Sequence, residues 1–154
     1  MDASYTSSIT EFAIVLAGFS GLVIAIGSKG GKSSPLTKHR TLCLLSFAFA
    51  AAFGSLLPAL ALSFGIPNIW TFSSYGLICI LLVAVSVVHL SARLLLNEEE
   101  RKKLAWYMYI LIYWVNAFLV FLLALMPIAG LFFIALVWQL IVSAILFTRL
   151  ILQS

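Results

Sequence analysis

Strongly polar side chains are rare inside the long apolar runs of this sequence, and they are the residues best suited to carry a function. They are Glu11, His89, Asn116 and Gln139. Such a group is costly to place in hydrocarbon, so each is a candidate for an ion or proton pathway unless a neighbouring group satisfies it. The sequence offers no nucleophile–base pair, paired-carboxylate site or metal-ligand cluster around them, so we do not predict an enzyme.

Asn116 and Gln139 are predicted to lie side by side near the middle of the membrane. Counted from a turn centred near Ile128, the two amides are almost equally distant, on adjacent antiparallel helices. A hydrogen bond between them would be worth on the order of 1 kcal/mol. We expect this structural role, and the alternative is that the amides line a wet cavity.

His89 is expected inside the membrane, nearer the cytoplasmic side. Counting from a turn near Pro67–Asn68 places it level with Ser46, roughly 10 Å from the cytoplasmic face by helical rise. A neutral imidazole that donates to a hydroxyl or carbonyl would be sufficient there, and a proton relay is the alternative. Haem or metal binding would need a second ligand at the same depth, whereas His39 is expected at the membrane edge. No cofactor is therefore predicted.

Glu11 is the hardest of these side chains to explain. It lies about one turn into the first apolar run, and the segments assigned below to that side of the membrane hold no Lys or Arg. The carboxyl group is expected to be protonated, to face water, or to accept hydrogen bonds from neighbours such as Ser63, Ser74 or Tyr75. In a ring of subunits with the first helix lining the axis, Glu11 would instead form an acidic ring, which favours cations.

Hydrocarbon is the expected solvent of the elements that carry these residues. Of the 154 residues, 64% are apolar and only 9% are charged, and the mean hydropathy of +1.17 lies well outside the range of soluble globular proteins. Roughly 20 helical residues cross the hydrocarbon core of a bilayer. We predict an all-α, polytopic membrane protein, a single domain over residues 1–154, with five transmembrane helices at Ser7–Gly27, Thr41–Phe64, Phe72–Leu96, Leu104–Met126 and Gly130–Leu152.

The basic residues predict the orientation of this bundle. All nine Lys and Arg fall in Ser28–Arg40, in Arg93–Lys103 and at Arg149, while the alternate connections hold none. By the positive-inside rule the basic segments are cytoplasmic, so the N-terminus is outside and the C-terminus is in the cytoplasm. Their confinement to short loops argues against nucleic acid as a partner, and anionic headgroups of the lipid bilayer are expected instead. Within the second segment, Asn97 is predicted to cap a helix that has acids in its first turn.

Small residues recur at four-residue intervals on the first two predicted helices, at Ala13, Ala17, Gly21 and Ala25 and again at Ser46, Ala50 and Gly54. Such faces let another helix backbone approach closely, so we expect the two faces to contact each other or a neighbouring subunit. Pro58 is predicted to kink the second helix near its outer end. Cys43 and Cys79 are expected to be small, buried apolar residues.

The segment Glu11–Gly27 resembles a recurring pattern in small bacterial multi-span membrane proteins of uncharacterised function. It has a glutamate followed by Gly-Phe-Ser-Gly-Leu-Val at Gly18–Val23 and then a basic loop, and the five-helix layout is similar. The resemblance implies this architecture and a bacterial inner membrane, and it singles out Glu11, Gly18 and Gly21. It implies no activity.

Two functional hypotheses follow. The first is a homo-oligomeric channel for cations or protons, because Glu11 and the small-residue face suit a ring of subunits and one subunit of five helices is too small to enclose an obvious aqueous path. The second is a non-catalytic structural or accessory subunit that packs against a partner membrane protein. Secondary transport is disfavoured because the chain has no internal repeat.

Overall fold

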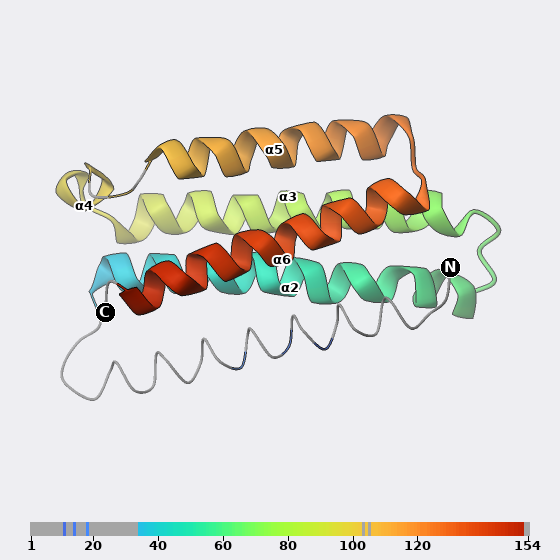
Figure 1. Ribbon diagram of the computed structural model, residues 1–154, viewed down its shortest axis with the longest axis horizontal. Coiled ribbons are helices and arrows are strands. Elements are labelled where there is room, and N and C mark those ends of the chain that lie inside the picture. The colour runs from blue at the N-terminus through green and yellow to red at the C-terminus, as the bar shows by residue number, and fades with distance from the viewer. Residues whose placement is uncertain are drawn as a thin grey trace.

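The computed structural model describes residues 11, 14, 18, 34–102, 104 and 106–152, and this part of the chain is all-helical, as predicted. Its elements are α2 (Pro35–Ser63), α3 (Ile69–Leu95), the short α4 (Glu98–Lys102), α5 (Trp106–Leu125) and α6 (Ala129–Leu152). The long helices alternate in direction, so α2 begins at the end of the bundle where α3 ends, α5 begins and α6 ends (Figure 1).

The four long helices are each long and apolar enough to cross a bilayer. They contain 20 to 29 residues, and about 20 are needed to cross. Large apolar side chains cover the outside of the bundle, among them Leu94 at 74% and Trp114 at 73% exposure. An apolar surface of this extent suits lipid, since soluble proteins rarely expose one. Of the predicted first span, Ser7–Gly27, only Glu11, Ile14 and Gly18 are described, and all three are helical.

Helix α2 begins six residues earlier than predicted, so the last six residues of the expected loop Ser28–Arg40 are helical instead. Ser34 is the N-cap, and its hydroxyl accepts a hydrogen bond from the backbone N–H of Thr37 at 3.2 Å. Pro35 follows at the first helical position, where its missing N–H costs nothing. The predicted end of this helix and the predicted bounds of the three later spans agree with α2, α3, α5 and α6 to within three residues, and the bounds Ser7 and Gly27 lie outside the described residues.

Local hydrogen bonds mark the end of α2 and the start of α4. After α2, Gly65 adopts a φ of 64°. The N–H of Gly65 donates to Leu62 O and that of Ile66 to Ala61 O, which is a Schellman motif. Asn97 caps α4 as predicted: its backbone N–H donates to the Glu100 carboxylate at 3.1 Å.

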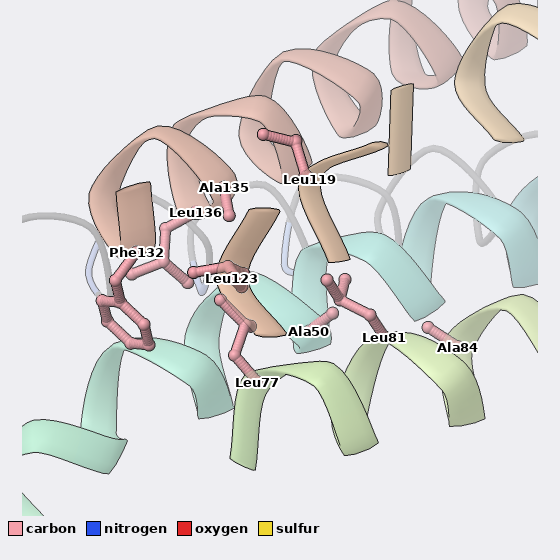
Figure 2. Close-up of a cluster of buried hydrophobic side chains, with 9 residues drawn as sticks. All are labelled: Ala50, Leu77, Leu81, Ala84, Leu119, Leu123, Phe132, Ala135 and Leu136. Atoms are coloured by element: carbon pink, nitrogen blue, oxygen red, sulfur yellow. The ribbon is translucent and has the colours of Figure 1, made fainter. Parts of the chain in front are cut away.

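The core lies where α2, α3, α5 and α6 meet, and Figure 2 shows their side chains converging. It consists of nine buried residues: Ala50, Leu77, Leu81, Ala84, Leu119, Leu123, Phe132, Ala135 and Leu136. A second buried cluster, which includes Phe47, Val88 and Val142, joins the same four helices nearer the start of α2. The most extensive contacts are those of α2 with α3 and with α6.

The small residues Ala50 and Gly54 let α3 and α6 approach α2 closely. Both are buried, and a Cβ atom at Gly54 would come within 2.8 Å of methyl groups of Leu77 and Leu136. The close contact at Gly54 is therefore made with α3 and α6, whereas the predicted partner was the first helix or a neighbouring subunit, and Ser46 is only half-buried. Of the first helix's small face, Ala13, Ala17, Gly21 and Ala25 lie outside the described residues.

Replacing Gly54 by leucine should destabilise the protein by about 1–3 kcal/mol, because the new side chain overpacks the contact with Leu77 and Leu136. Gly130→Leu is the matched control, since nothing lies within 4 Å of a Cβ atom there. Unfolding in detergent, followed by circular dichroism, would measure both. Equal stability of the two variants would contradict the close approach at Gly54.

Candidate functional site

The predicted amide pair is confirmed. Gln139 Nε2 donates to Asn116 Oδ1 at 2.8 Å, and Asn116 Nδ2 donates to the carbonyl of Ile112 at 2.9 Å. Asn116 is 3% exposed and Gln139 is fully buried, so the bond joins α5 to α6 within the core. The Gln139 Oε1 atom has no hydrogen-bond partner among the described residues. The pair therefore fixes how α5 and α6 sit against each other.

A second buried polar group, which the sequence analysis missed, centres on His39. His39 lies in the second turn of α2, yet it is only 1% exposed. Its Nδ1 lies 2.8 Å from Ser91 Oγ of α3, and its ring stacks on that of Tyr109 of α5 with centroids 6.1 Å apart. Three helices thus hold one imidazole at the basic end of the bundle.

The hydrogen bonds assign the proton of this imidazole. The Ser91 hydroxyl donates its only proton to the carbonyl of Val88 at 2.8 Å, so it accepts from an Nδ1–H of His39. In the neutral ring Nε2 then carries a lone pair, and it faces the Cys43 Sγ at 3.5 Å. The His39–Ser91 hydrogen bond links α2 to α3.

His89 is not part of the interior. Its side chain is exposed on the outside of α3. The hydroxyl of Ser46, with which it was expected to be level, donates to the carbonyl of Leu42 in its own helix at 2.7 Å. Two residues along a helix correspond to about 200° of rotation, so with Ser91 facing inward His89 faces outward. The prediction of an interior His89 is therefore wrong, and the histidine that the bundle buries is His39.

Glu11 and Gly18 lie on one exposed helical face. Together with Ile14 they follow the i, i+3, i+7 spacing, and all three are helical and exposed. A Cβ atom at Gly18 would meet nothing within 4 Å. Among the neighbours expected for Glu11, the Ser63 hydroxyl donates to the carbonyl of Ala59 instead, at 2.8 Å.

Two further expectations concern single residues. Cys43 is buried, as predicted, but Cys79 is exposed on α3, so the prediction for Cys79 is wrong. Both are free thiols. Pro58 is buried inside α2, and the helix runs past it to Ser63.

The described basic residues gather at one end of the bundle, where α2 begins, α3 ends, α5 begins and α6 ends (Figure 1). They are Lys38, Arg40, Arg93, Arg101, Lys102 and Arg149. No group of three or more His, Cys, Asp or Glu that could hold a metal ion occurs among the residues the structure describes. Comparison with protein-family models, with curated proteins and with solved structures finds no match to this chain.

Removing the Ser91 hydroxyl should destabilise the protein by about 1–3 kcal/mol, because Ser91→Ala leaves the buried His39 Nδ1–H without its acceptor. Ser86→Ala is the matched control on the same helix, since its exposed hydroxyl donates only to the carbonyl of Leu82 at 2.7 Å. Denaturant titration in detergent would compare them. A loss no larger than that of Ser86→Ala would show that Ser91 is not the partner of His39.

Proposed function

We propose that this chain is the subunit of a homo-oligomeric channel for cations or protons in a bacterial inner membrane. In this proposal the chain crosses the membrane five times, with its N-terminus outside and its C-terminus in the cytoplasm. The observation that carries it is the exposed position of Glu11 on a helical face that it shares with Gly18.

An exposed carboxylate on a membrane helix needs a polar environment. Facing lipid at depth is costly for an acidic side chain, whereas facing water or other polar groups between subunits is not. Gly18, with open space where a Cβ atom would stand, would let the helix of a second copy approach closely. Repeated around an axis, Glu11 would form a ring of negative charge, which attracts cations and repels anions.

The interior of one subunit favours a path between copies over a path through each copy. Asn116 and Gln139 are buried and hydrogen-bonded to each other. The core around α2, α3, α5 and α6 is filled by leucine, alanine and phenylalanine side chains. Ions would therefore pass between subunits, along the face of the first helix.

Neutralising the ring should reduce cation flux. We expect Glu11→Gln to lower the cation conductance of reconstituted liposomes by on the order of tenfold, the lower end of what charged clefts contribute to local ion concentration. Glu99→Gln is the matched control, because it removes an exposed carboxylate from α4 at the basic end. It should leave conductance unchanged.

One result would contradict the acidic ring, and another would contradict the channel itself. If Glu11→Gln conducted as well as the wild type, the acidic ring would be ruled out. A chain that carries no flux and purifies in fixed ratio with another membrane protein would instead be the accessory subunit of the alternative hypothesis.

The orientation has its own test by cysteine labelling. In a background with Cys43 and Cys79 replaced by alanine, Asn68→Cys lies between α2 and α3, and Lys102→Cys lies in α4 at the opposite end. An impermeant maleimide should label Asn68→Cys in intact cells, and Lys102→Cys only after permeabilisation, because basic segments stay inside. The reverse pattern would overturn the orientation but not the channel.

A further inference from the structure

A cavity of about 470 Å³ opens at the basic end of the bundle, between α3, α4 and the start of α5. Its volume falls within the range of sites that bind small molecules. Its lining includes Arg93 at the end of α3 and Arg101 in α4, together with His89. None of the described lining residues is acidic, so two guanidinium groups share one cavity with no carboxylate in its wall.

Arg101 is held in place by the end of α3. Its Nε donates to the carbonyl of Leu96 and one of its terminal nitrogens donates to the carbonyl of Arg93, both at 3.2 Å. These carbonyls neighbour the C-terminus of a helix, where cations are favoured. A guanidinium has five N–H donors, so donors remain for a ligand. The backbone thus fixes one positive group at the cavity without cancelling its charge.

The wall changes from charged to apolar with depth. Arg93 and Arg101 stand at the polar end, and Leu104 marks the approach to α5. From the start of α5 at Trp106 the lining runs along the helix, past Tyr109 and Ile110, to Tyr113, about 10 Å deeper by helical rise. A ligand that matched this wall would have an anionic head and an apolar body.

We propose that this cavity binds an anionic phospholipid, with the phosphate of its headgroup at Arg93 and Arg101 and an acyl chain in the groove between α3 and α5. Arginine pairs with phosphate through parallel N–H donors. The site lies at the polar end of four helices fit to cross a bilayer, so lipid headgroups are its natural neighbours. A free phosphate would use the arginines and leave the apolar groove empty. The proposal does not depend on the channel.

The test is lipid retention by the purified full chain. Delipidated protein in detergent is titrated with phosphatidylglycerol or with phosphatidylcholine of the same acyl chains, and bound lipid is counted by native mass spectrometry. The wild type should prefer phosphatidylglycerol. Arg93→Gln/Arg101→Gln should lower the affinity for phosphatidylglycerol roughly 25-fold, about fivefold for each basic group. Its affinity for phosphatidylcholine should fall less, because the choline group offsets the charge of that lipid's phosphate.

A matched variant distinguishes lipid binding in the cavity from a general effect of surface charge on lipid binding. Lys38→Gln/Lys102→Gln removes two positive charges from the same end of the bundle, at exposed residues that do not line the cavity. Their interaction with a lipid in the cavity would be screened by salt and water. This variant should bind phosphatidylglycerol within about threefold of the wild type. An equal loss in both double variants would overturn the proposal.

A second variant tests the groove without changing charge. Ala92 lines the cavity from α3, and Ala92→Trp would fill part of the groove, so it should also weaken phosphatidylglycerol binding. Ala92 takes no part in the hydrogen bonds of Arg101, so this variant covers the case in which the double arginine variant fails to fold. Full retention of phosphatidylglycerol by Ala92→Trp would overturn the proposal. So would competition by millimolar inorganic phosphate, which would identify a free-anion site.

Discussion

Hydrocarbon offers no hydrogen bonds, so every polar group of this bundle depends on a partner within the protein or at its surface. Hydrogen bonds within the helices satisfy the backbone N–H and C=O groups. Four short hydroxyl side chains, those of Ser46, Ser86, Ser143 and Thr148, each donate to the carbonyl four residues earlier in their own helix. The buried hydroxyls of Ser73 and Ser74 have no hydrogen-bond partner among the described residues. Only longer polar side chains reach another helix. Gln139 bonds to Asn116 between α6 and α5, and His39 bonds to Ser91 between α2 and α3.

In this fold the sequence predicts how deep in the membrane a side chain lies better than it predicts which way that side chain points. Short turns tie adjacent helices, so counting from the turn near Ile128 correctly brought Asn116 and Gln139 together. The same counting cannot tell which way a side chain points, because each residue rotates the direction by about 100°. His89 was assigned to the interior on depth alone and faces outward, while Ser91, two residues on, faces inward.

Lipid also removes the link between hydrophobicity and burial on which sequence analysis of soluble proteins relies. An apolar side chain is equally at home against lipid or in the core, which is why Cys79 was wrongly expected to be buried. Small residues still predict where helices pack closely, because only they let two helix backbones come near each other. Gly54 does lie where α3 and α6 approach α2. The early start of α2 had a local signal as well: Ser34 followed by Pro35 is a typical helix N-terminus.

The four long helices pack unequally against one another. Helix α2 packs extensively on α3 and α6, whereas α5 contacts α3 and α6 less and turns large side chains such as Trp114 and Phe118 outward. At the basic end the cavity lies between α3 and α5, and the Arg101 hydrogen bonds tie α4 to the end of α3. A lipid bound there would stabilise the folded state by an amount that grows with the logarithm of the lipid concentration above its Kd. The position of α5 would then depend on the charge of the surrounding membrane, through residues remote in sequence from Glu11.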